Sequence, residues 1–226
     1  MDFYKVSWLI YILCLVISLF SSYYVKRMFN IYKFKKTKSN KNNKNMVDYM
    51  IKKHNLNLKV NNIGGELTDF YNPKDRSLNL SGSYDSNNVS SIAVAAHEVG
   101  HAIQHEEGYS FMKLRTSLVP IVNLVSTGGY IALVIGLLFS SPRYVVGGIW
   151  MEMASLIFSL VTLPVEFNAS RRAMAEIKAS GYLSKDEEKG AGKVLKAAAL
   201  TYVASSLVAF LNLARFMMLA SSRDDR

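Results

Sequence analysis

The chain has 226 residues, half of them hydrophobic, and a formal net charge of +10. The apolar residues are grouped in long blocks instead of recurring with the period of an amphipathic helix or strand, which predicts that much of them faces lipid. The basic residues cluster beside these blocks without interleaved aromatic residues, so orientation in a membrane is favoured and nucleic-acid binding is not. The single cysteine, Cys14, excludes a disulfide framework and a thiolate metal site.

Residues 1–25 are predicted to form an amino-terminal transmembrane anchor. The 19 residues 7–25 carry no charge, which is enough helix to cross a hydrocarbon core of about 30 Å. Basic residues follow this stretch and no small-x-small cleavage site precedes Lys26, so we expect a retained span and not a signal peptide. Eight Lys or Arg lie from Lys26 to Lys44, and the positive-inside rule therefore predicts an outer amino terminus and a cytoplasmic segment after the span.

Residues 26–45 are predicted to be a basic linker. The part from Lys35 to Asn45, KKTKSNKNNKN, is polar and of low complexity. We expect it to be mobile, and its charge also suits contact with anionic lipid headgroups.

Residues 46–115 are predicted to form the catalytic region. Met46 to Leu58 has the spacing of a short amphipathic helix, and Lys59 to Leu80 is predicted to form two strands around the turn Asn72-Pro-Lys-Asp75. Two interpretations of residues 64–73 stay open. They form either a plain hairpin in a small α+β domain or a sheet edge whose backbone pairs with an extended substrate.

The strongest motif lies in AVAAHEVGHAIQHEE, residues 93–107, which contains H-E-x-x-H. On a helix, His97 and His101 lie one turn apart on one face, so both imidazoles can bind a single Zn²⁺ while Glu98 reaches the water that the metal carries. Polar residues 85–91 provide helix-capping side chains, and Gly108 is predicted to end the helix.

A chance occurrence of this short motif is the alternative, because two surface histidines one turn apart need not bind anything. The chain has only four histidines, and three of them are His97, His101 and His105, which favours a metal site. His105 lies about 12 Å along the helix axis from His97, too far to share its metal. We expect His105 on a solvated face or behind the ligands.

Residues 116–165 are predicted to form a transmembrane hairpin. Residues 116–141 are uncharged, residues 144–165 contain one charge, and Ser-Pro-Arg between them suits a tight outer turn. The hairpin would return the chain to the side of the membrane that it left.

A catalytic zinc needs a third protein ligand and one open position. Gln104 and Glu107 occupy the places of the Gly and the last His of the longer H-E-x-x-H-x-x-G-x-x-H motif, so we expect a carboxylate. The downstream candidates are Glu106, Glu107, Glu152, Glu166, Glu176, Glu187 and Glu188. Glu166 is favoured because it follows Pro164, which can start a new helix, at the end of a membrane-length segment.

Residues 166–196 are predicted to be a helical region that carries the third ligand. A break at Ser180-Gly181 and a capping box from Ser184 to Glu187 separate two helices there. Residues 197–219 are predicted to form a carboxy-terminal transmembrane helix whose uncharged part is rich in small residues; an amphipathic surface helix is the alternative.

Within the spans we expect Glu152 to pair with Arg215, because an ionised group in lipid needs a partner or water. The alternative is that Arg215 extends to the outer surface while Glu152 is protonated or faces a wet cavity.

The motifs AAHEVGHAIQ and LPVEFNASRRA, with a membrane hairpin between them, resemble the bacterial YugP-type neutral zinc metallopeptidases. The resemblance runs from GGELTDFYNP to AALTYVA, most of the chain. A more distant similarity links it to the HtpX-type and CAAX-prenyl endopeptidases, whose third ligand is the Glu of E-x-x-x-D. Here Ser170 stands where that pattern has Asp, so this position lacks the carboxylate that would orient a zinc-bound histidine.

Together these features predict a mainly α, multi-span membrane protein with a small α+β zincin-like catalytic domain on the cytoplasmic side. The predicted activity is zinc-dependent hydrolysis of peptide bonds in a peptide or protein substrate, with His97, His101 and Glu166 as ligands and Glu98 as general base. Arg171 matches the Arg that follows the family's Asp, and it either steadies the oxyanion or pairs with a Glu. The alternative function is a catalytically silent membrane adaptor.

Overall fold

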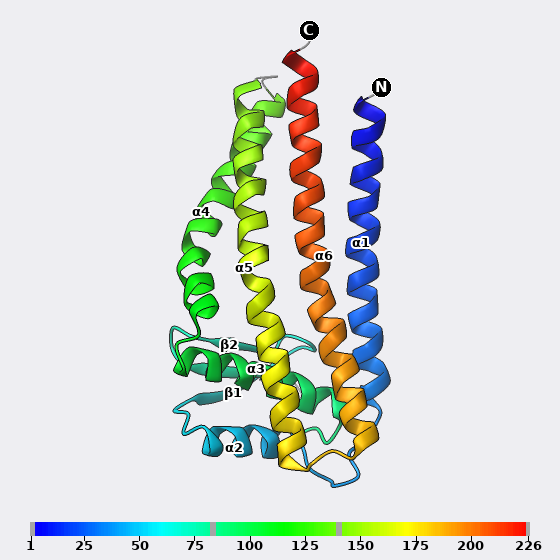
Figure 1. Ribbon diagram of the computed structural model, residues 1–226, viewed down its shortest axis with the longest axis vertical. Helices are drawn as coiled ribbons and strands as arrows, with labels where there is room; N and C mark the ends of the chain where they lie inside the picture. Colours follow the sequence, from blue (N-terminus) through cyan, green and yellow to red (C-terminus); the bar gives the residue numbers. More distant parts are fainter. Residues whose placement is uncertain (1–2, 82–84, 139–141, 225–226) are drawn as a thin grey trace. The chain divides into compact units, whose positions relative to one another are not determined.

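The computed structural model describes residues 3–81, 85–138 and 142–224 (Figure 1). It is mainly helical with one small sheet, as predicted. Its elements are α1 (Phe3–Lys33), α2 (Asn43–Lys53), β1 (Lys59–Ile63), β2 (Phe70–Asn72), β3 (Ser77–Ser81), α3 (Val89–Glu106), α4 (Ser110–Leu138), α5 (Pro142–Ser180) and α6 (Lys185–Asp224). The chain divides into two compact units. The first takes the described parts of Met1–Ser22, Leu114–Leu163 and Thr201–Arg226, and the second consists of Tyr23–Lys113 and Pro164–Leu200.

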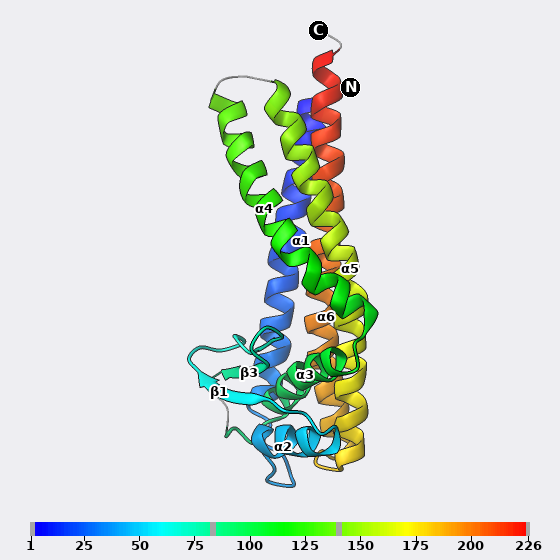
Figure 2. The ribbon, with the colours of Figure 1, turned by 90° about the vertical axis from the view of Figure 1, so that its left-hand side faces the viewer.

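The sheet of the second unit has the order β1-β3-β2, with β3 parallel to β1 and antiparallel to β2. Two strands were predicted around the turn after Asn72, and the structure has both of them. The structure has a third strand, β1, which the prediction merged with β2 into one strand. All five residues of β3 are buried because it is central, and Figure 2 shows β1 beside it. Strand β2 is an edge strand that lies against α3.

Helix α2 starts three residues earlier than the predicted amphipathic helix. Asn42 caps it by accepting the amide of Asn45, and the Asn45 side chain accepts the amide of Asn42 in return. Met46, Val47 and Met50 are fully buried, which confirms the predicted apolar face.

The predicted mobile linker is wrong in part. Helix α1 continues to Lys33, so the beginning of residues 26–45 is helical. Further along, the amide of Thr37 donates to the Asn87 carbonyl and the amide of Val89 donates to the Lys35 carbonyl, at 2.8 and 3.1 Å. These bonds attach the segment to the start of α3, because a polar sequence can satisfy its backbone on a neighbouring loop as well as in water.

The predicted helix ends are confirmed. Gly108 and Gly181 have φ of +67° and +66°, the left-handed conformation that glycine adopts readily after a helix. Half of the predicted capping box is present where α6 begins: the Ser184 amide donates to the Glu187 carboxylate at 2.7 Å, but the Ser184 hydroxyl has no hydrogen-bond partner within the described residues. The proposed helix start at Pro164 is wrong, because this proline lies inside α5.

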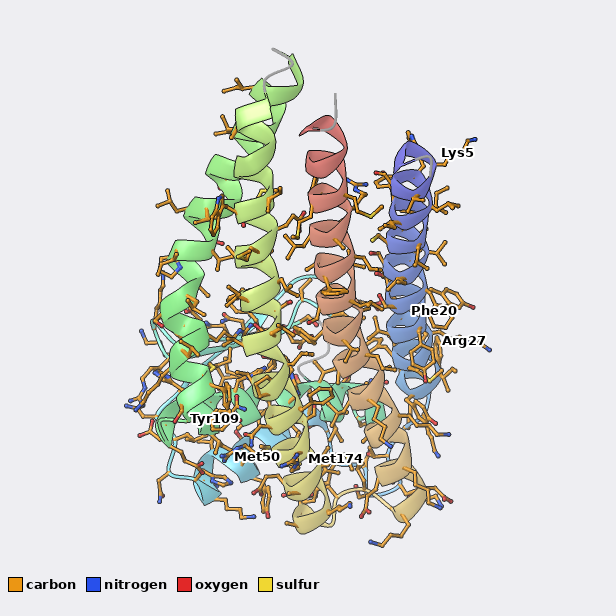
Figure 3. All side chains as sticks on the ribbon, turned by 45° about the horizontal axis from the view of Figure 1, so that its top comes forward. Lys5, Phe20, Arg27, Met50, Tyr109 and Met174 are labelled. Atoms are coloured by element: carbon orange, nitrogen blue, oxygen red, sulfur yellow. The ribbon has the colours of Figure 1, made fainter. Side chains whose placement is uncertain are left out.

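Three helices are long and apolar enough to cross a membrane, over Lys5–Lys33, Gly147–Ser180 and Lys185–Met218, in the part of the chain that was described. Trp8, Leu19 and Phe20 on α1 are each more than 60% exposed, and Figure 3 shows Phe20 standing out from the helix. Such a row of exposed apolar side chains is suited to lipid. The fourth predicted span, residues 116–141, corresponds to α4 up to Leu138, and its last residues lie outside the described ones.

Helices α4 and α5 pack through glycine in the first unit. A Cβ at Gly129 would lie 2.5 Å from Cβ of Met151, and one at Gly147 would lie 3.5 Å from Cβ of Ala132. This close packing is consistent with the predicted hairpin. The predicted turn includes Ser141, which lies outside the described residues.

Helix α5 is longer than a bilayer needs. Its 39 residues extend about 58 Å, against about 30 Å of hydrocarbon core. Only its apolar first part can therefore lie in lipid. The part from Pro164 onward belongs to the second unit.

Candidate metal centre

Helix α3 carries the two histidines of the motif. Asn88 caps it by accepting the amide of Ser91 at 2.9 Å, and small residues let it pack deeply, so that most of the helix is buried. The rings of His97 and His101 lie edge to face with centroids 4.7 Å apart. The one-turn spacing thus puts both imidazoles on the buried face.

Helix α5 brings Glu166 to these histidines. The two helices touch at Gly100, where an added Cβ would lie only 2.8 Å from the carbonyl oxygen of Ala169. Because Gly100 has no side chain, the α5 backbone can approach α3 closely. Glu166 is 1% exposed, so its carboxylate lies in the protein interior and faces the histidines.

The three side chains converge on one point. Oε2 of Glu166 lies 3.1 Å from Nε2 of His97 and 3.5 Å from Nε2 of His101. One ligand atom from each residue lies within 4.8 Å of the other two. All three side chains are buried, and residues 69 positions apart in sequence meet here.

Gln104 fixes the tautomer of His101. Its amide nitrogen donates to the Val165 carbonyl at 2.8 Å and to the Asn168 side-chain oxygen at 2.9 Å. Its amide oxygen therefore faces Nδ1 of His101, 3.0 Å away, and accepts a hydrogen bond. Nδ1 must carry the proton, which leaves the lone pair of Nε2 directed at Glu166.

Ser170 lies beside Nδ1 of His97, as Gln104 lies beside Nδ1 of His101. The Ser170 hydroxyl oxygen lies 3.2 Å from Nδ1 of the His97 ring. With Nδ1–H donating to this oxygen, Nε2 of His97 also presents a lone pair to Glu166. A neutral hydroxyl replaces the carboxylate expected from the distant relatives, so the ring is oriented but gains less basicity.

This donor set fits zinc. Burial alone would raise the pKa of Glu166, but hydrogen bonds and charge from His101 and His97 in their protonated forms outweigh burial and hold the pKa well below its usual range. A bound cation would take the place of these protons and leave the carboxylate ionised between two neutral rings. An anion and two nitrogen lone pairs in a buried site need a cation between them. Ligands on a tetrahedral zinc lie about 3.3 Å apart, given metal–ligand distances of about 2.0–2.1 Å. The distances of 3.1 and 3.5 Å from Glu166 Oε2 to the two histidine nitrogens bracket this value.

Glu98 follows His97 directly; part of the residue is exposed, but its carboxyl group is enclosed by protein. One of its oxygens accepts the amide of Tyr71 at 3.0 Å, so edge strand β2 positions the carboxylate. Burial raises the pKa of Glu98 to about 7, opposed by His97 and reinforced by the charge of Glu166. A carboxyl group with this pKa can both take and return a proton near neutral pH.

Most of the other candidate carboxylates have different partners. Glu106 pairs with Arg76, Glu107 with Arg172, and Glu188 with Lys185. Glu176 binds Lys53 and His54 at 2.8 and 2.9 Å, and Glu187 accepts backbone amides. His105, which was expected behind the ligands or on a solvated face, lies 2.7 Å from the Tyr71 hydroxyl through Nδ1.

Arg171 is not brought to the cluster. Its side chain is exposed and lines a groove on α5. Within the described residues no hydrogen bond or ion pair joins it to Glu98, Glu166 or another carboxylate. The neighbouring Arg172 instead lies near the site.

The sequence interpretation missed a supporting network around the ligands. Arg172 donates to the Asn168 side-chain oxygen at 2.7 Å and pairs with Glu107 at 2.6 Å, which lowers the pKa of Glu107 below its usual range. Asn168 in turn accepts from Gln104. The sequence does contain a signal for Gln104. This residue follows His101 by three positions and therefore lies on the same helix face.

Comparison with known proteins identifies the group to which this fold and site belong. Residues 7–221 match the family described as "Putative neutral zinc metallopeptidase". The chain belongs to this family. It is also 44% identical over 165 residues to the "Putative membrane protease YugP" of Bacillus subtilis (strain 168), covering 72% of this chain and 73% of the relative. No solved structure matches.

Family membership agrees with the geometry. The family description refers to zinc, and the buried His97, His101 and Glu166 could hold a metal ion. The relative is named as a membrane protease, in keeping with three helices that are long and apolar enough to span.

Proposed function

We propose that the protein is a zinc-dependent membrane endopeptidase. The observation that carries this proposal is the convergence of three buried acceptor atoms from His97, His101 and Glu166 on one point, with Glu98 in the next position after the first ligand. Acceptors in this arrangement can hold a cation, and the adjacent Glu98 carboxylate can accept and release a proton.

A zinc ion bound there supplies a Lewis acid that polarises the scissile carbonyl and acidifies a water molecule. Glu98 takes the proton of the attacking water on its carboxylate oxygen and passes it to the leaving amine. The amide of Tyr71 holds this carboxylate in place. Gln104 and Ser170 keep the Nδ1 protons of the two histidines directed away from the metal, so that both rings present Nε2.

The substrate proposed is a peptide or protein segment at the membrane. We propose four spans from the uncharged lengths of the sequence. The distribution of basic residues favours an outer amino terminus and a metal centre on the cytoplasmic side. The edge strand β2 offers backbone groups beside Glu98, which supports the interpretation that an extended substrate pairs there.

Metal content and activity together test this function. The protein purified in detergent should hold close to one zinc per chain, and His97→Ala or Glu166→Ala should lose it. Glu98→Gln should retain the metal and abolish peptide hydrolysis. Glu106→Gln is the matched control, because Glu106 lies on the same helix and pairs with Arg76 at the surface, and it should keep both properties.

The silent-adaptor alternative gives a different result. A protein that binds zinc but shows no hydrolysis in wild type and Glu98→Gln alike, across peptide libraries and membrane proteins, would be an adaptor. Full activity of Glu98→Gln would refute the assigned base. Zinc retained by Glu166→Ala would refute Glu166 as the third ligand.

A further inference from the structure

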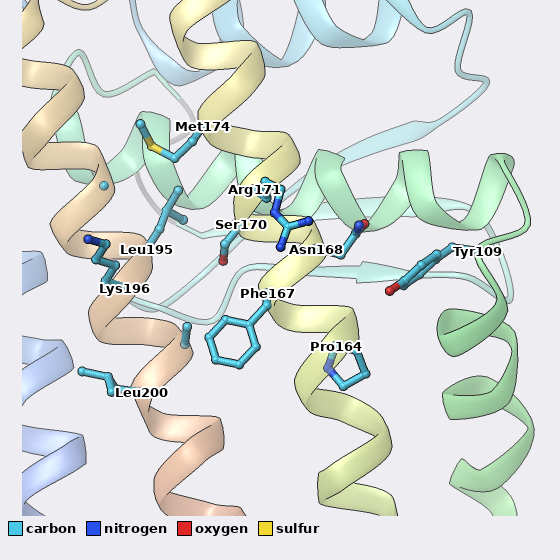
Figure 4. A pocket seen from close by; sticks show the side chains of 12 residues that line it. Tyr109, Pro164, Phe167, Asn168, Ser170, Arg171, Met174, Leu195, Lys196 and Leu200 are labelled. Atoms are coloured by element: carbon cyan, nitrogen blue, oxygen red, sulfur yellow. The ribbon is translucent and has the colours of Figure 1, made fainter.

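A groove of about 810 Å³ lies along α5 and α6 in the second unit (Figure 4). Its walls are mostly apolar, with Phe167 and Met174 from α5 and Leu195 and Leu200 from α6. Phe167 and Leu200 are 45% and 48% exposed. The groove therefore presents apolar side chains that water solvates poorly.

This groove is not the hydrolytic cleft. None of His97, Glu98, His101 or Glu166 lines it, and Glu98 instead lies against strand β2. Ser170 lines the groove and also contacts His97. The groove is thus a separate site that lies behind one metal-binding histidine.

Two cationic side chains, Arg171 and Lys196, lie on the groove walls, and no carboxylate does. Both are exposed, and among the described residues neither forms an ion pair. Figure 4 shows the guanidinium on α5 and the ammonium on α6, on either side of Ser170. An occupant is therefore expected to be anionic at one end and apolar along the rest.

The position of the groove along α5 and α6 indicates which kind of molecule occupies it. On α5 the groove begins at Pro164, directly after residues 144–163, which are apolar apart from Glu152. On α6 it ends at Leu200, directly before the uncharged residues 201–214. Both helices continue without a break into these membrane-length stretches. The groove walls are therefore continuous, along each helix, with surface suited to lipid.

We propose that this groove binds one anionic phospholipid. The phosphate lies on Arg171 and Lys196, and an acyl chain covers Phe167, Leu195 and Leu200. Proteins bind anionic headgroups at the cytoplasmic face of a membrane with basic side chains beside apolar surface. An acyl chain would also bury the apolar walls of the groove, which a free anion would leave exposed.

Lipid binding by the full-length protein in neutral detergent tests the proposal. Dioleoyl phosphatidylglycerol is titrated, and bound lipid is counted by native mass spectrometry, with the thermal midpoint as a second readout. We expect one saturable site and a raised midpoint. Arg171→Gln with Lys196→Gln should weaken binding roughly 30-fold, since each basic residue contributes about one kcal/mol.

The matched control is Lys178→Gln with Lys193→Gln. These lysines are exposed on the same two helices and lie outside the groove, so the loss of charge is the same while binding should change less than about threefold. Leu200→Asn should weaken lipid binding without altering the charges. Dioleoyl phosphatidylcholine should bind at least roughly tenfold more weakly, because it has no net charge, and glycerol 1-phosphate should not saturate the site.

Several outcomes would overturn the proposal. Equal loss in both double variants would show non-specific attraction, and equal binding of phosphatidylcholine would remove the role of the anion. Tight binding of glycerol 1-phosphate would make the site one for a soluble phosphate. Unchanged lipid binding with a raised KM for a peptide would assign the groove to substrate. These readouts need no hydrolysis, so they stand apart from the test of the proposed function.

Discussion

Gly100 on α3 lies directly against the backbone of Ala169 on α5. An added Cβ would come within 2.8 Å of the Ala169 carbonyl oxygen, closer than side-chain carbons approach a backbone oxygen. Since Ala169 is part of a helix, it cannot yield by rotating a side chain. The approach of the two helices, and with it the meeting of Glu166 and the histidines, depends on this glycine.

Gly100→Ala should therefore lower the free energy of unfolding by about 1–3 kcal/mol, the usual cost of overpacking. This loss is expected although alanine favours a helix over glycine by about 1 kcal/mol. Bound zinc should fall in parallel, because α5 must shift. Thermal unfolding in detergent and metal analysis measure the two effects.

Gly192→Ala on α6 is the control for that substitution. A Cβ there would meet the side chain of Met174 at 3.9 Å, an ordinary contact distance. The higher helix propensity of alanine should then be the main effect, and the free energy of unfolding should stay the same or rise. If Gly100→Ala behaved in the same way as Gly192→Ala, the contact with Ala169 would not limit the approach of the helices.

The meeting of His97, His101 and Glu166 could be predicted from the sequence because the chemistry of a metal site leaves few choices. Spacing on one helix places His97 and His101 together, and the hairpin argument identified Glu166 among seven carboxylates. The same reasoning could not find Ser170 as the partner of His97, since that contact depends on how α5 rotates against α3. Arg171 was proposed as a site residue because of its place in a family pattern. Its position on α5 instead directs it to the groove.

The errors in the fold have a related cause. Local pattern identified the strands beside Asn72 but could not show that β1 pairs in parallel with β3, because that pairing is between residues 18 apart. The polar segment after Lys33 looked disordered by composition, although its order comes from hydrogen bonds to residues about 50 positions away. Contacts between distant segments are the information that composition lacks.

Ser170 should set the zinc affinity through His97. Ser170→Ala removes the hydrogen bond to Nδ1, and groups in this position typically change metal affinity by about 10- to 100-fold, so a loss of about tenfold is expected for a neutral partner. Ser170→Asp should raise the affinity, because a carboxylate makes the imidazole more basic. Competition with a chelator, read as zinc retained, measures both.

Ser205→Ala is the control for Ser170, since the Ser205 hydroxyl donates to the Tyr202 carbonyl of its own helix. It should leave zinc binding unchanged. An unaltered chelator profile for both Ser170 variants would mean that the hydroxyl does not orient His97.

Glu176 should give the second unit an acid-sensitive stability. Burial alone would raise its pKa, but hydrogen bonds from Lys53 and His54 outweigh burial and hold the pKa below the ordinary value of 4.5. A carboxylate with a lowered pKa stabilises the fold above its unfolded pKa, and this contribution disappears as the pH falls through the folded pKa. The stabilisation is therefore complete at neutral pH and lost below about pH 4.5.

Glu176→Gln should consequently cost about 1–2 kcal/mol of unfolding free energy at pH 7, and the difference from wild type should shrink towards pH 3. Denaturant titrations across this range provide the measurement. Asp186→Asn, which removes an exposed charge, should be neutral throughout. A Glu176 effect that is constant with pH would exclude ionisation as its source.

Arg215 in the first unit interacts mainly with aromatic rings. Its guanidinium lies 5.3 Å from the ring centre of Tyr11 and 4.9 Å from that of Phe216. The predicted ion pair with Glu152 does not form as a direct contact in the described residues, although the two charges influence each other. A cation over an aromatic face is stabilised by about 0.5–2 kcal/mol, and by more where water is excluded.

Tyr11→Leu should thus destabilise the protein by about 1 kcal/mol, whereas Tyr11→Phe keeps the ring and should be near neutral. A double-mutant cycle of Tyr11→Leu with Arg215→Gln should show coupling, and it should exceed that of Glu152→Gln with Arg215→Gln. Stronger coupling in the second cycle would restore the ion pair as the dominant interaction.

The orientation of the chain can be read from single cysteines placed in a Cys14→Ser background. Lys185 has a side chain 87% exposed, and Lys44 on α2 is also exposed, so cysteines at both positions are open to a reagent. With this part of the chain in the cytoplasm, a membrane-impermeant maleimide should label Lys185→Cys and Lys44→Cys only after lysis. Ser141→Cys, in the predicted outer turn, should be labelled in intact cells. Labelling of Lys44→Cys in intact cells would reverse the orientation and put the metal centre outside, where the positive-inside rule does not place so basic a segment.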